Sequence, residues 1–416
     1  MESLSPSTAR SMRSRRTRFV CIADTHNRPV KLPKGDVLIH AGDLTNQGSY
    51  SELAKAVYWL ENTDFEAKIV IAGNHDITLD RDFYARRGSS LHSQSIQDPE
   101  ECISLLTSSP TVTYLCHSQA TIRLTKPDGP RTTFTVFGSP YSPRVGRWAF
   151  DYARSDLASG SSSPGPHPLA PDTEHPAVGI QSQPLPGPTA AELWSSIPLA
   201  TDILVTHTPP HLHCDRSTTH DLNLGCEDLR RALWHIRPRL HVCGHVHEAR
   251  GAERVRWDIR GEGREPYTEV GAEPWVDPCP DGGKISLVDL TGRGGRAPLD
   301  NDGSHPATAP QLGPGSQTGD PTQRGLGSFG ESSASGRPAN CGDADPEGGA
   351  LLTGQAGDPE SMARCDRASL LGRTGRRETC VVNCAIAATS WPHAGGRRFH
   401  KPVVVDLDLP VCEGQD

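Results

Sequence analysis

Six short apolar runs constrain the fold of this 416-residue chain more than any other feature. They are FVCIA (19–23), DVLIHA (36–41), KIVIA (68–72), FTVFG (134–138), DILVT (202–206) and LHVCG (240–244). The runs are nearly continuous in apolar residues and do not alternate with polar ones, as strands buried on both faces should read. We therefore predict strands that are covered by another layer on each side.

Two helical patterns lie between these runs. Residues 49–62 open with Ser49 and Glu52 at the spacing of a capping box, and residues 226–236 follow Gly225. Apolar residues recur at helical spacing in both segments, namely Leu53, Ala56, Val57 and Leu60 in the first and Leu229, Ala232, Leu233 and Ile236 in the second. Strands that alternate with helices predict a layered α/β core.

Two segments interrupt the pattern. Glycine (41) and proline (36) are abundant in the chain. The segment at about 158–188 is rich in Ser, Pro and Gly, and the longer segment at about 258–377 is rich in Gly, Pro, Asp and Ser. Such segments bury too little apolar surface to offset chain entropy, so we predict two long disordered insertions. Within the second, only residues 284–290 form an apolar island. Strand-like runs resume at 380–388 and 401–409, so residues 17–416 are predicted to form a single interrupted domain.

The N-terminal residues 1–16 are rich in serine and arginine, and we predict a disordered basic tail rather than a mitochondrial-type signal. They lack the apolar core of a secretory signal, so we expect an intracellular, cytoplasmic protein with reduced thiols. No apolar run approaches the roughly 18–20 residues that cross a bilayer. The net charge of −8 gives no reason to expect a nucleic-acid partner.

Polar residues of one kind stand where five of the apolar runs end. The first is followed by Asp24 and His26, the second by Asp43, the third by Asn74 and His75, the fifth by His207, and the sixth by His245 and His247. The carboxyl edge of the strands is where an α/β sheet binds its ligands. Asp24 and His26 are two residues apart, so in an extended chain both side chains would point to one face. His245 and His247 share that spacing.

The donor types at this edge indicate a metal site. Carboxylates, an amide oxygen and neutral imidazoles suit zinc, iron or manganese better than calcium. No cysteine belongs to the set, which argues against a closed structural zinc site. Seven ligands are too many for one ion but suit two ions that share a carboxylate. Gly42, Gly73 and Gly244 precede the ligands, where we expect sharp turns and close backbone approach.

Taken in order, the motifs DTH, GD, GNHD, THTPP and GHVH resemble the signature of the calcineurin-like metallophosphoesterases. The flanking stretches ADTHNR, GDVLIHAGDLTNQG, FGSPYSPRVGRWAFDY and HVCGHVHEARG look like one branch, the small metallophosphoesterase-domain-containing proteins with brain and fungal members. The resemblance covers about residues 17–157, 190–257 and 380–410. It implies a four-layer αββα sandwich with two divalent metal ions (manganese, iron or zinc) at its rim.

The resemblance also implies a role for each site residue. Asp24, His26 and His247 would hold the first metal, Asn74, His207 and His245 the second, and Asp43 would bridge the two. A metal-bridging hydroxide would attack the phosphorus, and His75 would be the catalytic residue that faces the phosphate and the leaving group. We expect Asp76 to orient His75, and we interpret Trp148 as a packing residue rather than as a stacking platform.

The residues after Asp43 read LTNQG, whereas protein Ser/Thr phosphatases of this superfamily typically continue with Asp-Arg-Gly. This departure argues against a phosphoprotein substrate. The resemblance therefore implies a metal-dependent phosphodiesterase with small phosphodiester or nucleotide substrates, 3′,5′-cyclic nucleotides among them. Both His245 and His247 are present, so we expect an active enzyme.

Two alternatives stay open. One is another metal hydrolase such as an amidohydrolase, although those begin with His-x-His on the first strand and this chain has Asp24 and His26. The other is a catalytically weak protein of the same fold that acts as a protein-interaction module, with the insertions binding protein partners.

Overall fold

The computed structural model describes residues 13–154, 188–260, 266–278, 283–305, 366–389, 396 and 398–412. Most of the strands in this part of the chain belong to two large sheets. The first runs in the order β15 (Ser286–Asp289), β17 (Val403–Pro410), β1 (Ser14–Ile22), β2 (Val37–Ala41), β3 (Ala67–Ile71) and β4 (Val112–Tyr114). The second runs in the order β14 (Glu269–Pro274), β13 (Gly251–Trp257), β16 (Glu378–Asn383), β12 (Leu240–Cys243), β9 (Ile203–Thr206), β6 (Thr133–Ser139) and β5 (Ser118–Arg123).

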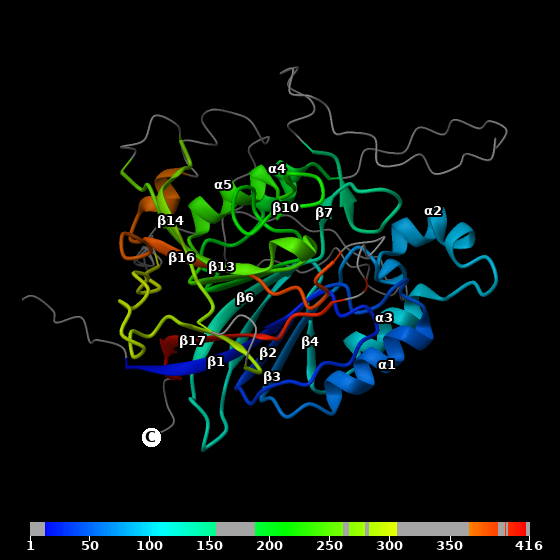
Figure 1. The fold of residues 1–416 in the computed structure, drawn as a ribbon, viewed down its shortest axis with the longest axis horizontal. Helices are drawn as coiled ribbons and strands as arrows, with labels where there is room; N and C mark the ends of the chain where they lie inside the picture. The colour runs from blue at the N-terminus through cyan, green and yellow to red at the C-terminus, as the bar shows by residue number, and fades with distance from the viewer. Residues whose placement is uncertain are drawn as a thin grey trace, which may run out of the picture.

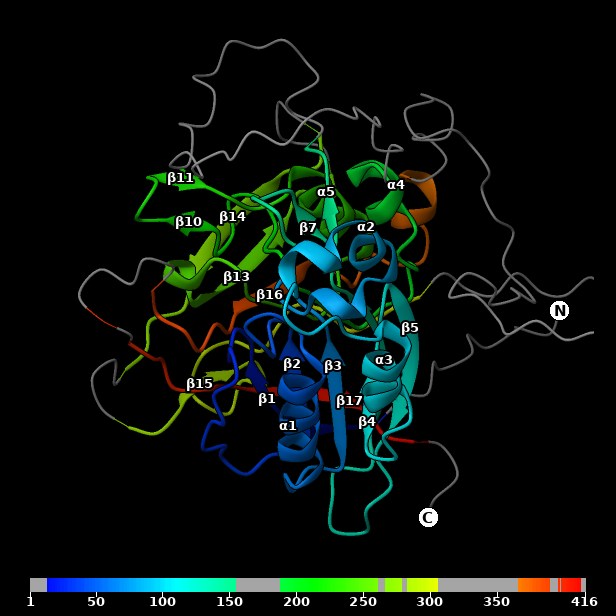
Figure 2. The same cartoon turned by 90° about the vertical axis from the view of Figure 1, so that its right-hand side faces the viewer.

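Helices cover the outer face of each sheet, as Figures 1 and 2 show. The first sheet carries α1 (Tyr50–Glu61) and α3 (Pro99–Thr107), and α2 (Arg81–Leu91) packs beside them; the second carries α4 (Ala190–Ser195) and α5 (Glu227–Ile236). The remaining short elements are β7 (Ser142–Pro143), β8 (Asp151–Tyr152), β10 (Arg216–Ser217), β11 (Leu222–Asn223) and the 3-10 turns η1 (Ile77–Leu79) and η3 (His247–Ala249). The order of layers is thus helix, sheet, sheet, helix, which confirms the predicted αββα sandwich.

Strand β1 shows why the apolar runs are continuous. Phe19 and Cys21 point into the core between the two sheets, whereas Val20 and Ile22 point into the core beneath α1 and α3. Because successive side chains of a strand face opposite sides, the part of β1 that lies between two layers, residues 19–22, is apolar at every position. The predicted strands at 19–23, 36–41, 68–72, 134–138, 202–206 and 240–244 are all present. Their ends agree to within one residue, except that β1 begins five residues earlier than predicted.

The two predicted helices are also present. In α1 the Ser49 side chain accepts a hydrogen bond from the Glu52 amide, and the Glu52 carboxylate accepts one from the Ser49 amide at 3.0 Å, so the predicted capping box is confirmed. Helix α5 ends at Arg237, whose φ of 45° is left-handed and stops the helix.

The predicted insertion at 258–377 is too long at both ends. It contains β14, β15 and a helical segment at residues 366–370, and the apolar island at 284–290 is β15 itself. Two buried arginines fix the end of this segment to the core. Arg373 donates to the backbone oxygens of Leu199 and His235, each at 2.6 Å, and Arg376 donates to Thr201 and pairs with Asp202 at 3.0 Å. Composition missed this attachment because charged residues rarely mark a core.

Other boundaries also change. Strand β1 begins at Ser14, so the predicted tail 1–16 extends too far, and residues 1–12 lie outside the described residues. The predicted insertion at 158–188 and the centre of the second, 306–365, lie almost wholly outside them as well. No helix in the described ranges combines the length and the apolar character needed to cross a membrane.

Candidate metal centre

The carboxyl ends of five strands meet at one place. Strands β1, β2 and β3 are parallel neighbours in the first sheet, and β9 and β12 are parallel neighbours in the second. The site therefore lies where the matching edges of two packed sheets come together. The sequence had suggested the edge of a single sheet. Each strand delivers its polar residues from the loop that follows it.

The backbone at this edge is bent rather than extended. Asp24 (φ 54°), His26 (φ 44°), Asp43 (φ 54°) and His245 (φ 68°) all lie in the left-handed region, which is uncommon for residues other than glycine. The inference that Asp24 and His26 share a face because the chain is extended is therefore wrong in its reason. A turn brings both side chains to the centre, held by hydrogen bonds from the Asp24 amide to Gly42 O (2.9 Å) and from the His26 amide to Asp43 O (3.1 Å). Such strained conformations concentrate at functional sites.

Three glycines allow these loops to approach one another. Gly42 has φ 95°, and a β-carbon there would overlap the His207 ring and a backbone oxygen. A β-carbon at Gly73 would overlap Asp43, and one at Gly244 would overlap the Asp24 carboxylate. The close approach predicted for all three positions is confirmed, and a sharp turn that needs positive φ is seen at Gly42.

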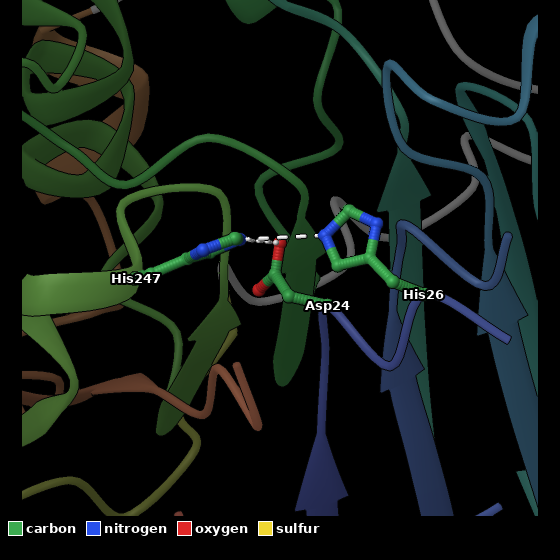
Figure 3. Close-up of side chains that lie close together, drawn as sticks. All are labelled: Asp24, His26 and His247. Carbon is green, nitrogen blue, oxygen red and sulfur yellow. Dashed lines mark hydrogen bonds and ion pairs between the residues drawn. The ribbon is translucent and has the colours of Figure 1, made fainter. Parts of the chain in front are cut away.

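Asp24, His26 and His247 form the first donor group, drawn in Figure 3. His247 Nε2 lies 3.4 Å from Asp24 Oδ1 and 3.4 Å from His26 Nε2. One ligand atom from each residue lies within 4.8 Å of those from the other two. A carboxylate and two imidazoles at this separation are a suitable ligand set for a divalent transition metal.

Asp43, His207 and Asn74 lie on the other side of the centre. His207 Nε2 is 2.9 Å from Asn74 Oδ1 and 3.5 Å from Asp43 Oδ1. The second carboxylate oxygen of Asp43 faces the first group, 3.6 Å from His26 Nε2. His245 lies beside His207, with ring centroids 4.9 Å apart, and its amide donates to Asp24 at 3.1 Å. Asp43 thus stands between two sets of donors.

The histidine rings are oriented by backbone carbonyls. Nδ1 faces Thr45 O in His26 (3.2 Å), Ala41 O in His207 (2.9 Å) and Thr389 O in His247 (3.2 Å). Because a carbonyl oxygen can only accept, each Nδ1 must carry the hydrogen, and each Nε2 is turned toward the carboxylates. Metal-binding histidines are typically fixed in this way by a partner at the other ring nitrogen. The residues present therefore fit a bound divalent metal ion.

The charges of the site favour a cation. Burial lowers the pKa of His26 to about 4 and that of His245 to about 3, so both rings are neutral at pH 7, as metal ligands must be. Burial alone would raise the pKa of Asp24 and Asp43, but neighbouring histidines, chiefly His247 and His207, bring both below the ordinary value. Both carboxylates are therefore charged.

His207 is different. Burial opposes its protonation, but the charge of Asp43 and the hydrogen bond to it raise the pKa of His207 to about 9. In metal-free protein at pH 7 His207 is therefore protonated, and its positive charge offsets part of the negative charge of Asp24 and Asp43 that a bound metal ion would otherwise offset.

Because His207 carries a proton in the metal-free protein, we predict that metal affinity depends on pH. Below pH 9 a metal that binds His207 must displace the proton, so we expect this step to raise Mn²⁺ affinity by up to about tenfold per pH unit between pH 6 and pH 8. Asp24 and Asp43 add nothing to this slope because they are already ionised. His247 adds to it in the same direction, because burial opposes its protonation but the hydrogen bond and charge of Asp24 outweigh burial and raise the pKa of His247. Titration calorimetry of metal-free protein in buffers of different ionisation enthalpy measures both the affinity and the released proton. An affinity that does not change over this range would contradict the prediction, and His207→Gln should flatten the slope.

His75 lies next to the centre with a fixed ring. Its amide donates to Asp43 Oδ1 (2.9 Å), its Nδ1 contacts Asn46 O (2.8 Å), and its ring stacks on Trp148 with centroids 3.8 Å apart. Ligand atoms of His75, His26 and Asp43 also lie within 4.8 Å of one another. Trp148, interpreted from the sequence as a packing residue, therefore forms one face of the His75 site. No motif spacing would have revealed this contact.

Asp76 does not contact the His75 side chain, so the expectation that it orients that ring is wrong. Its buried carboxylate instead accepts hydrogen bonds from the amides of Leu44 (3.2 Å), Thr45 (2.9 Å) and Gly73 (2.9 Å). It thereby ties the loop that carries Asp43 to the loop that carries Asn74. The donors on both loops make Asp76 a structural support of the centre.

A cavity of about 1080 Å³ opens over the centre. His26, Asp43 and His75 form part of its lining, and so do Val145 and Trp148 from the segment between β7 and β8. Arg28, Arg398 and Phe399 line it as well. Sequence reasoning assigned no role to these last three residues.

A four-layer αββα sandwich that gathers aspartate and histidine side chains at its strand ends offers a site for divalent metal ions. Residues 17–249 match the calcineurin-like phosphoesterase family, and the chain belongs to this family.

Several relatives share this region. The chain is 36% identical over 264 residues to a protein of Emericella nidulans named "Probable rhamnogalacturonate lyase C". The aligned region covers 63% of this chain and 20% of that protein. It is 35% identical over 245 residues to human metallophosphoesterase domain-containing protein 1, covering 56% of this chain and 62% of the relative. A UPF0046 protein of Caenorhabditis elegans is 34% identical over 236 residues, covering 56% and 64%. The chain therefore spans less than two thirds of the length of these relatives.

Among solved structures, a purple acid phosphatase from yellow lupin (Lupinus luteus) seeds aligns with 61% of this chain and 41% of its own, at 12% identity and a TM-score of 0.29. The membership of the phosphoesterase family and the named branch of relatives agree with the resemblance seen in the sequence.

Proposed function

We propose that this protein is a dinuclear metal-dependent phosphodiesterase that hydrolyses small phosphodiesters, with 3′,5′-cyclic nucleotides as candidate substrates. One observation carries the proposal: Asp43 presents one carboxylate oxygen to His207 and the other to His26, at 3.5 and 3.6 Å. A carboxylate between two donor groups is what a pair of metal ions requires as a bridge.

The two groups assign ligands to two ions. Asp24, His26 and His247 would hold the first, Asn74, His207 and His245 the second, and Asp43 would serve both. When bound, the two ions would lower the pKa of coordinated water to near 7, supply the attacking hydroxide and neutralise charge on the phosphate. Manganese, iron and zinc all accept this mixture of oxygen and nitrogen donors.

The chain's own contribution to bond cleavage centres on His75. Asn46 O holds its Nδ1, and Trp148 stacks on the ring, so the imidazole has a fixed orientation in the cavity. In the protonated form, Nδ1 donates to Asn46 O and Nε2 remains to donate to the departing ester oxygen. Proton transfer from a positioned histidine of this kind typically accelerates such steps by about 10²–10⁴-fold.

The cavity supports a substrate larger than inorganic phosphate. A volume of about 1080 Å³ is slightly above the roughly 300–1,000 Å³ of sites that hold drug-sized ligands, so a nucleotide or an aryl diester can be accommodated. The lyase in the name of the fungal relative is not carried over to this chain, since the chain matches only 20% of that protein.

The experiment that tests the proposal is a substrate screen of purified protein. Metal-free protein is loaded in turn with Mn²⁺, Zn²⁺ and Fe²⁺ and assayed on bis-p-nitrophenyl phosphate, 3′,5′-cyclic AMP and p-nitrophenyl phosphate, and on p-nitrophenyl acetate and p-nitroacetanilide as a carboxylic ester and an amide. We expect hydrolysis of the diesters that chelation abolishes and metal restores. Turnover of amides or carboxylic esters alone would favour an amidohydrolase. Activity as low in the wild type as in Asp43→Ala and His75→Ala would favour the protein-interaction role.

A further inference from the structure

One wall of the cavity is formed by a stacked pair to which the sequence assigned no role. The guanidinium carbon of Arg28 lies 3.8 Å from the centre of the Phe399 ring, and both residues line the cavity. Phe399 is 39% exposed, unusually open for a phenylalanine. Within the part of the chain that the structure describes, Arg28 has no carboxylate partner, so its recorded side-chain contact is the aromatic ring. The pair is therefore a planar surface that faces a ligand-sized space.

This wall is joined to the metal centre through the backbone. Phe399 forms a β-bridge with Ala387, and the His400 amide donates to Ile386 O at 2.7 Å. The same short segment is bonded to the loop of the first donor group, because the Ile386 amide donates to Ala23 O at 2.9 Å and the Ala387 amide donates to Asp24 O at 3.2 Å. Phe399 is thus held at a defined position relative to Asp24.

The two ends of the substrate can be told apart by what surrounds them. His75, which would protonate the leaving oxygen, stacks on Trp148, so the leaving group belongs near these two rings. The segment that pairs with Phe399 is bonded to the opposite side of the first donor group, since the Ala387 amide donates to Asp24 O and His247 Nδ1 donates to Thr389 O. His75, in contrast, lies beside His26 and Asp43. The ester group that remains on phosphorus would therefore be the one that reaches Arg28 and Phe399.

We propose that Arg28 and Phe399 form a subsite for a planar aromatic ring on the non-leaving arm of the substrate. A guanidinium that lies on one ring can stack a second ring on its opposite face, and such contacts reward flat π-systems over alkyl chains. A simple aryl group and a nucleobase share this chemistry. The inference rests on the proposed phosphodiesterase function and specifies the substrate that the same site would prefer.

The test uses three diesters with one leaving group: the methyl, phenyl and thymidine-5′ esters of p-nitrophenyl phosphate. We expect the wild type to prefer the phenyl or thymidine ester over the methyl ester in kcat/KM. Phe399→Ala and Arg28→Ala should reduce this preference by about fivefold or more, with little change for the methyl ester. Arg28→Lys keeps the charge but loses the planar group, so it should resemble Arg28→Ala. A higher kcat/KM for the thymidine ester than for the phenyl ester would indicate a nucleobase as the ligand, and the reverse order would indicate a simple aryl group.

A purely structural role would lower the rates of all three esters equally. Matched controls are Tyr58→Ala, which removes an aromatic side chain that is 70% exposed, and Arg123→Ala, which removes an exposed arginine; both should leave the preference unchanged. Calorimetry of metal-free protein gives a readout that needs no turnover: Phe399→Ala should weaken binding of the phenyl ester about fivefold but not that of the methyl ester.

Two results overturn the inference, and they differ. If the wild type hydrolyses the three esters without preference, or if the variants keep the preference, the subsite is wrong and the phosphodiesterase proposal stands. If the metal-loaded wild type hydrolyses no ester, the phosphodiesterase proposal fails and the subsite fails with it.

Discussion

Asp43→Asn is expected to lower kcat on bis-p-nitrophenyl phosphate by at least about a thousandfold, which corresponds to about 4 kcal/mol of lost transition-state stabilisation. The substitution keeps the shape of the side chain but removes its charge and replaces one oxygen with an amide that can only donate. Asp43 Oδ1 faces His207 Nε2 at 3.5 Å and Oδ2 faces His26 Nε2 at 3.6 Å, so either orientation of the amide leaves one donor group without its shared oxygen. We therefore expect the bound metal to fall from two ions per chain to one or fewer.

Metal content by inductively coupled plasma mass spectrometry, together with the rate, measures this prediction. The matched control is Asp64→Asn, which removes the charge of a carboxylate that is fully exposed and should leave both quantities unchanged. A variant that retained two ions and a normal rate would refute a bridging role for Asp43. Loss of folding would be visible as a lower thermal midpoint, and it would separate a structural effect from a loss of ligands.

The elements that could be predicted from the sequence are those buried on both faces, because burial on both faces restricts most of their residues to apolar types. The C-terminal half of β1, residues 19–22, lies between two layers and is therefore apolar throughout, and β2, β3, β9 and β12 are predominantly apolar for the same reason. Helix α2 could not be predicted in this way because it buries only Phe83, Tyr84 and Gly88 and carries three arginines. Strand β5 is mostly exposed and likewise lacks a clear pattern.

The same limit explains what was missed in the site. The ligand residues were found because they follow buried strands directly, where the change from apolar to polar is abrupt. Asp76, Trp148, Arg28 and Phe399 reach the site or its cavity through loops, and nothing in the local sequence fixes where a loop returns. Asp76 shows this best: its position next to His75 suggested a contact, but the turn at Gly73 directs its carboxylate to Leu44 and Thr45 instead. Neighbours in sequence are poor guides where the backbone turns sharply.

His75→Ala is expected to lower kcat by about 10²–10⁴-fold on 3′,5′-cyclic AMP, whose leaving group is an alkoxide that needs a proton. The loss should be much smaller on bis-p-nitrophenyl phosphate, because p-nitrophenolate is a stable anion and departs without one. Metal content should not change, since His75 contacts Asp43 Oδ1 through its backbone amide at 2.9 Å, and alanine keeps that amide. Rates on both substrates and metal content of the same preparation measure the three expectations.

The dependence on the leaving group separates two roles of His75. A residue that only helps to hold metal or phosphate would slow both substrates to the same extent when removed, whereas a proton donor is missed only where the leaving oxygen is a strong base. His220→Ala removes an exposed loop histidine and serves as the control, for which both rates should stay at the wild-type level. An equal loss on the two substrates, together with a reduced metal content, would place His75 among the metal ligands, in line with the close approach of its ring to His26 and Asp43.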